Sequence, residues 1–211
     1  MKSYLSSFKK GNMVKRALAI FLATGFFTAA APLCAIEFGA KAGASLSFVF
    51  EPNEIYNASN LLGIKGGVFA SFPLSGLFSW QPEINYVVRG GRYYSAHVRG
   101  TRSARFNYLE IPVLVNLSLK GKSISFFIGP YYGILLSSTP LDDEHDWCWK
   151  GYKLRRSDAG LVAGGRWRLK SVFVELQYTH GLMNIMTDPN SSATLLDHKN
   201  HCAALLIGYV I

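Results

Sequence analysis

The chain has 211 residues, of which 17% are charged and 14% are aromatic, and its formal net charge is +9. This length suits one domain or two small ones, and the charged fraction is low for a soluble protein. Much of the positive excess lies in the first 35 residues, so it gives little support to nucleic-acid binding.

The N-terminal segment has the layout of a secretory signal peptide. Five basic residues between Lys2 and Arg16 precede the apolar run ALAIFLATGFFTAAAPLCA, which ends in small residues. This order predicts export of the protein, with cleavage between Ala35 and Ile36. Loss of these 5 from the 22 basic residues leaves 17 against 13 acidic residues, a net charge of +4.

Three alternatives remain for this segment. The apolar run is long enough to be a retained membrane helix. Cys34 suggests a lipoprotein, although the usual leucine three residues before the cysteine is missing. A translation start at Met13 would leave a more compact signal peptide.

From residue 36 onward, apolar residues recur at every second position, which is typical of strands. We expect eight strands, at about 36–49, 61–72, 77–90, 103–119, 123–137, 156–169, 171–184 and 198–211. The intervening breaks alternate between long and short. This alternation predicts an antiparallel up-and-down β-barrel over residues 36–211, with tight turns at one end and large loops at the other.

The stretch FSWQPEINYVV, residues 78–88, shows the alternation clearly. Phe78, Trp80 and Ile84 share one face, whereas Gln81, Glu83 and Asn85 share the other. This odd–even pattern of positions, or parity, does not by itself decide which face points to the outside of the barrel. The polar faces are rich in glycine and the apolar faces end in aromatic residues, so we expect the apolar face to contact lipid.

Six segments together resemble the PorT-like outer-membrane β-barrel family, which is typical of Bacteroidota. They are FGAKAGASLS, FASFPLSGLFSWQPEINYVVRGG, FNYLEIPVLVNLSL, FFIGPYYGILLSS, DAGLVAGGRWRL and VFVELQYTHGLMNI. The resemblance implies an eight-stranded transmembrane barrel in a Gram-negative outer membrane, inserted by the barrel-assembly machinery. The chain departs from the usual pattern because Ile211, rather than an aromatic residue, comes last.

The inward face of such a barrel should carry a polar network. An eight-stranded barrel is only wide enough for side chains to fill, so we expect a packed, hydrogen-bonded plug. A narrow ion path and a catalytic carboxylate pair are the alternatives. The expected inward residues are Lys65, Gln81, Glu83, Asn85, Glu110, Asn116, Arg166, Arg168, Glu175 and Gln177.

The second long break is basic and aromatic. It carries Arg89, Arg92, Arg99, Arg102 and Arg105, interleaved with two tyrosines and a histidine. Arginine suits phosphate, so this segment predicts contact with lipopolysaccharide at the outer leaflet, particularly through Arg92, Arg99 and Arg102. The alternative is a solvated loop, or one paired with the acidic segment DDEHD.

Two cysteines, Cys148 and Cys202, follow the signal segment and would meet an oxidising compartment. They form either a disulfide or two separate thiols. No metal-ligand spacing of a standard kind is present, so we expect no metal, cofactor or enzyme activity.

These features predict a monomeric outer-membrane barrel with a structural or surface-interaction role. One alternative is a narrow solute channel or an accessory of protein secretion. Another is a soluble, lipocalin-like binder in the periplasm, in which the apolar faces would point inward.

Overall fold

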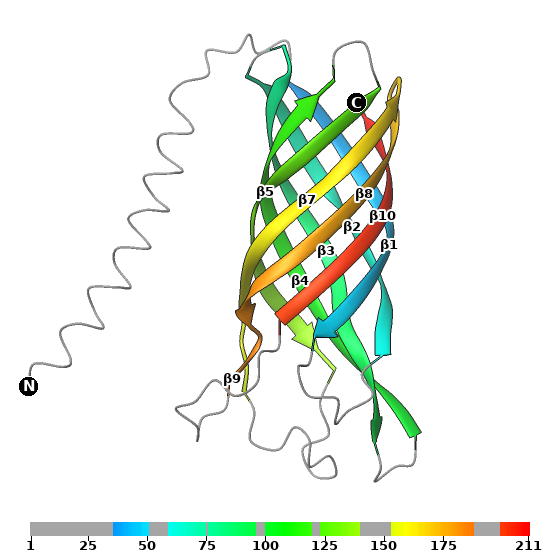
Figure 1. Cartoon of the computed structure of the whole chain (residues 1–211), viewed down its shortest axis with the longest axis vertical. Coiled ribbons are helices and arrows are strands. Elements are labelled where there is room, and N and C mark those ends of the chain that lie inside the picture. Colours follow the sequence, from blue (N-terminus) through cyan, green and yellow to red (C-terminus); the bar gives the residue numbers. More distant parts are fainter. Residues whose placement is uncertain are drawn as a thin grey trace, which may run out of the picture. The chain divides into compact units, whose positions relative to one another are not determined.

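The barrel is built from eight long strands that close on themselves (Figure 1). The computed structural model describes residues 36–50, 59–74, 76–95, 100–119, 123–139, 153–187 and 199–211. Residues 1–35 lie outside this part of the chain, so the signal peptide and its cleavage site stay predictions. No helix in the described segments is long and apolar enough to cross a membrane.

Every strand of the barrel pairs antiparallel with two neighbours, in the order β1-β10-β8-β7-β5-β4-β3-β2, and β2 closes the ring on β1. The strands are β1 (Glu37–Phe50), β2 (Ser59–Pro73), β3 (Phe78–Ser95), β4 (Gly100–Ser118), β5 (Ile124–Ser138), β7 (Ser157–Leu169), β8 (Val172–Asn184) and β10 (Lys199–Val210). Two further pairs of residues, β6 (Lys153–Leu154) and β9 (Met186–Thr187), form a small separate sheet. The predicted eight-stranded antiparallel barrel is confirmed.

The two ends of the barrel differ, as the lengths of the sequence breaks predict. Tight connections join β2 to β3, β4 to β5 and β7 to β8 at the end where the chain terminates (Figure 1). Lys170 makes the β7–β8 turn with a φ of 56°, a conformation that non-glycine residues adopt mainly in such turns. In membrane barrels the tight-turn end faces the periplasm.

The segment 91–101, which the sequence suggests is a loop, is largely an extension of two strands. β3 and β4 stay paired up to the partners Ser95 and Gly100. Gly90 allows this continuation, because its φ of 143° suits only glycine and a Cβ would lie 1.9 Å from the Ala104 carbonyl oxygen. The prediction of a loop is therefore wrong for most of this segment.

The outer surface of the barrel is apolar along its strands. Leu62, Leu176, Leu205 and Ile207 each expose more than half of their surface, and Leu176 exposes 64%. Large apolar side chains do not remain in water over a whole barrel wall. They match a lipid solvent, in which the closed ring also satisfies the backbone hydrogen bonds.

Aromatic residues edge this apolar wall near both ends. Phe78, Trp167 and Tyr209 lie on the outer face near the tight turns. Towards the other end, the Tyr86 hydroxyl donates to Asn107 Oδ1 at 3.0 Å, and the Tyr178 hydroxyl lies 3.1 Å from His201 Nδ1. Such residues, apolar in body and polar at the tip, are typical of membrane interfaces.

The position of the lipid band predicts a depth-dependent cost for charge on the outer wall. Leu176→Arg, between the aromatic belts, should destabilise the barrel by about 2–4 kcal/mol, and Leu182→Arg, six residues towards the outer end, by about 0–1 kcal/mol. Reversible unfolding by denaturant in lipid vesicles measures both. Equal costs at the two positions would contradict the assignment of the band.

Candidate functional site

Among the described residues, the barrel interior contains four basic and four acidic side chains, each at most 9% exposed. The opposite charges are equal in number, so the described interior has no formal net charge. Buried charges are stable only when they are paired and hydrogen-bonded. The basic residues are Lys41, Lys65, Arg89 and Arg166, and the acidic residues are Glu83, Glu110, Asp158 and Glu175.

One cluster centres on Lys41 of β1. Its Nζ atom lies 2.8 Å from Glu83 Oε1 and 2.7 Å from Glu175 Oε1, so one ammonium group joins β3 to β8 across the barrel. The Arg166 guanidinium donates from Nε and Nη2 to Glu175 Oε2, at 2.9 and 2.6 Å. Glu175 is therefore held by two cations on different strands.

Amide side chains extend this cluster. Gln81 and Asn85 donate to the two oxygens of Glu83, at 2.6 and 2.8 Å. Gln81 Oε1 accepts from Arg166 Nη1 and from Asn116 Nδ2, both at 3.1 Å. The amides thus satisfy lone pairs that the cations leave open, which lowers the cost of burying the carboxylates.

A second cluster centres on Arg89 of β3. It donates to Glu110 and to Asp158, with Nη1 lying 2.8 Å from Asp158 Oδ2. Lys65 Nζ lies 2.5 Å from the other oxygen of Glu110. Tyr131 and Asn200 also donate to Asp158 Oδ2, at 3.0 and 3.1 Å.

Apolar side chains fill the space beside the charged clusters. Phe69, Phe173 and Val210 form one buried group, in which the two phenyl rings lie edge to face at 5.7 Å. The Arg166 guanidinium lies 4.3 Å from the Phe173 ring centroid, within the range of a cation–π interaction. The middle of the interior therefore combines charged with apolar layers of packed side chains.

The structure places nearly every predicted inward residue inside the barrel. Lys65, Gln81, Glu83, Asn85, Glu110, Asn116, Arg166, Glu175 and Gln177 are all buried. The prediction that Arg168 belongs to the buried network is wrong. Its side chain is 38% exposed at the tight-turn rim and pairs with Glu37 rather than with the buried clusters. Arg168 occupies the last inward-facing position of β7 before the β7–β8 turn, where the barrel opens.

Sequence reasoning missed three members of the network. Arg89 was expected in the outer basic segment but is buried, since it continues the inward parity of Gln81, Glu83 and Asn85. Lys41 lies among alanine, glycine and serine, where the alternation is weak. Asp158 has the same inward parity as Arg166, so its burial could have been predicted from the alternation in this strand.

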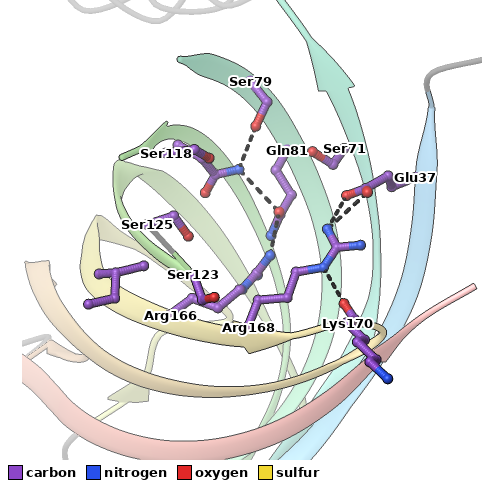
Figure 2. A pocket seen from close by; sticks show the side chains of 12 residues that line it. Glu37, Ser71, Ser79, Gln81, Ser118, Ser123, Ser125, Arg166, Arg168 and Lys170 are labelled. Atoms are coloured by element: carbon purple, nitrogen blue, oxygen red, sulfur yellow. Dashed lines mark hydrogen bonds and ion pairs between the residues drawn. The ribbon is translucent and has the colours of Figure 1, made fainter. Parts of the chain in front are cut away.

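A cavity of about 310 Å³ opens at the tight-turn end of the barrel (Figure 2). Arg166, Gln81 and Asn116 of the first cluster form part of its lining. Glu37 accepts from Arg168 Nη1 at 2.9 and 2.7 Å on its two oxygens, and Arg168 Nε donates to the Lys170 carbonyl oxygen at 2.7 Å. Five serines also line it, namely Ser71, Ser79, Ser118, Ser123 and Ser125. We call this cavity the vestibule.

The remaining predicted sites are only partly described. Arg92 is exposed on the β3–β4 hairpin, Arg99 lies outside the described residues, and only the backbone of Arg102 is described. Cys202 is a buried free thiol, and Cys148 lies outside the described residues, so the disulfide stays a prediction without structural support. No cluster of three or more metal-ligating side chains occurs in the described segments.

The sequence matches the family described as outer membrane protein beta-barrel domain over residues 31–187. The chain belongs to this family. The membership, together with the apolar outer wall, places the protein in the bacterial outer membrane. The soluble, lipocalin-like alternative is therefore wrong. No curated protein matches the chain.

Solved structures of outer-membrane proteins are similar to the chain. Neisserial surface protein A is 9% identical, with a TM-score of 0.53 over 82% of this chain and 96% of that chain. OprG from Pseudomonas aeruginosa is 12% identical, with a TM-score of 0.49 over 83% and 95%. Ail of Yersinia pestis, solved with the heparin analogue sucrose octasulfate, is 15% identical, with a TM-score of 0.49 over 83% and 99%.

The geometry of the Lys41 cluster predicts a large cost for removing its cation. Lys41→Met leaves Glu83 and Glu175 facing each other in the interior, which should lower the free energy of unfolding by about 3–5 kcal/mol. Arg168→Gln, at the half-exposed rim pair, should cost about 0–1 kcal/mol. Denaturant unfolding of both variants in lipid vesicles measures the difference, and similar losses would contradict a buried, charge-coupled cluster.

Proposed function

We propose that this outer-membrane barrel is a closed, non-conducting scaffold whose outer end contacts lipopolysaccharide. The role proposed is structural and interactive rather than enzymatic, and the barrel acts as a monomer after insertion by the barrel-assembly machinery. The observation that carries the proposal is the neutral, paired network of eight buried charges inside the ring.

The network supports a closed interior because its members bridge opposite parts of the wall. Lys41 joins β1 to β3 and β8, and Arg89 joins β3 to β4 and β7. A hydrated ion path would require these contacts to break and each charge to find another partner. The alternative of a narrow channel is therefore disfavoured.

The outer end supports contact with phosphorylated lipid. Arg92 and Arg105 are exposed on adjacent strands, paired with Ser103 and Gly90. On β4, Arg105 lies two residues before Asn107 on the outward face, and so nearer the outer end than the interfacial Tyr86–Asn107 contact. Guanidinium groups at this height lie where lipid phosphates gather, and they bind phosphate through paired donors.

Within the family, the six segments quoted above support a finer assignment to the PorT-like barrels of Bacteroidota. The combination of Gln-Pro-Glu in β3, Tyr-Leu-Glu-Ile-Pro in β4 and Gly-Pro-Tyr in β5 carries this proposal. Such an assignment fits a scaffold or secretion accessory better than it fits an enzyme.

A closed interior predicts that the barrel does not conduct ions. Purified protein reconstituted in planar bilayers should give no steady unitary current, because no described layer of the interior is free of packed side chains. Lys41→Ala combined with Glu83→Ala and Glu175→Ala removes the central bridge and should produce detectable openings. Steady unitary currents from the unaltered protein would refute the closed scaffold.

The lipid proposal predicts a loss of lipopolysaccharide binding from the β3–β4 hairpin. The double variant R92A/R105A should bind about tenfold more weakly, because two exposed ion pairs contribute roughly 0.5–1 kcal/mol each. R92A/R99A/R102A tests the full set of arginines predicted from the sequence. Binding is measured with immobilised barrel and lipopolysaccharide-containing vesicles.

R155A/R156A is the matched control, since both arginines are exposed at the outer end directly before β7, which β5 separates from the β3–β4 hairpin. It removes the same charge and should leave binding within twofold of the unaltered protein. Equal losses in the control and in R92A/R105A would mean that total charge, and not the hairpin, attracts the lipid.

A further inference from the structure

We propose that the vestibule binds an uncharged, hydroxyl-rich ligand, a mono- or disaccharide or a similar polyol, from the periplasmic side. This inference concerns the tight-turn end of the barrel and goes beyond the lipid contact proposed for the outer end. It depends on the shape, charge balance and hydrogen-bonding groups of the cavity.

The charges around the vestibule are already neutralised. The Arg166 guanidinium pairs with Glu175, and Arg168 pairs with both oxygens of Glu37. Lys170 contributes its carbonyl oxygen to Arg168, and its side chain extends away from that contact (Figure 2). Apart from the Lys170 ammonium at the rim, the charged side chains of the lining are paired with one another or with Glu175, which favours a neutral ligand over a phosphate or a carboxylate.

The polar groups suit a ligand that both donates and accepts. Five serine hydroxyls can act in either sense, and the Asn116 side-chain oxygen is buried without a donor in the described part of the chain. Asn116 is 4% exposed, and its amide nitrogen is fixed by Ser79 and Gln81. Asn116 Oδ1 is therefore a buried acceptor without a donor, next to a residue face that lines the cavity.

The size of the cavity and its closed floor favour binding over passage. A volume of about 310 Å³ is at the lower end of small-molecule sites, roughly 300–1,000 Å³. Beyond Arg166 lie the Phe69 and Phe173 rings and the Lys41 cluster, so a ligand that enters stops there. No aromatic ring is among the lining residues, so the dissociation constant should be on the order of 1 mM.

The test uses the full mature barrel in detergent micelles and follows two resonances by NMR, the side-chain amides of Asn116 and Gln81. The probes are maltose, diacetylchitobiose and inorganic phosphate. We expect saturable shifts with at least one of the two sugars and none with phosphate. S118A/S123A/S125A should weaken sugar binding at least tenfold, and Ser125→Phe, which fills the cavity, should abolish it.

S103A/S138A is the control, because both serines are exposed at the outer end and their loss should not change the shifts. Three results would overturn the proposal: no saturable shift with either sugar, shifts with phosphate alone, or sugar shifts that the vestibule variants leave unchanged. The first means a cavity that holds only water, and the second an anion site. Thermal unfolding of each variant shows that it remains folded.

Discussion

Charge neutrality inside a narrow ring is the constraint on which the rest of this structure depends. Eight strands leave room only for side chains, so water cannot solvate an unpaired charge in the interior. The four cations and four carboxylates meet this constraint by pairing across strands that are distant in sequence, as Lys41 does with Glu175. The result specifies which strands face each other, because another register would separate the partners.

The same constraint explains why the apolar half of each strand faces outward. Once the inward positions are committed to a paired polar network, the alternate positions must meet the solvent outside, and that solvent is lipid. Leu176 and Glu175 are neighbours in β8, yet one is 64% exposed and the other fully buried. A one-residue slip would place the carboxylate in hydrocarbon and the leucine among charges, so the register is fixed by both faces together.

Much of this arrangement could be predicted from the sequence, because strand parity is a local signal. The parity of FSWQPEINYVV assigned Gln81, Glu83 and Asn85 to the interior, and the structure places them there. Parity could not predict which buried charges form ion pairs, since it does not show that Lys41 contacts Glu83, 42 residues away in the chain. Arg89 was assigned to the outer basic segment with Arg92, although it lies within the strand and has the same inward parity as Gln81, Glu83 and Asn85.

The distribution of chemistry between the ends follows from the same packing. In the middle of the barrel, the described charged side chains are paired with one another and the outer wall faces lipid. Polar side chains that can bind other molecules therefore lie at the two rims. At the outer rim, exposed Arg92 and Arg105 carry charge beyond the interfacial tyrosines. At the inner rim, Arg168 is neutralised by Glu37 and the serines remain. We therefore propose that the barrel divides its recognition chemistry between its two ends, with anionic lipid bound at the outer end and neutral polar ligands at the inner end.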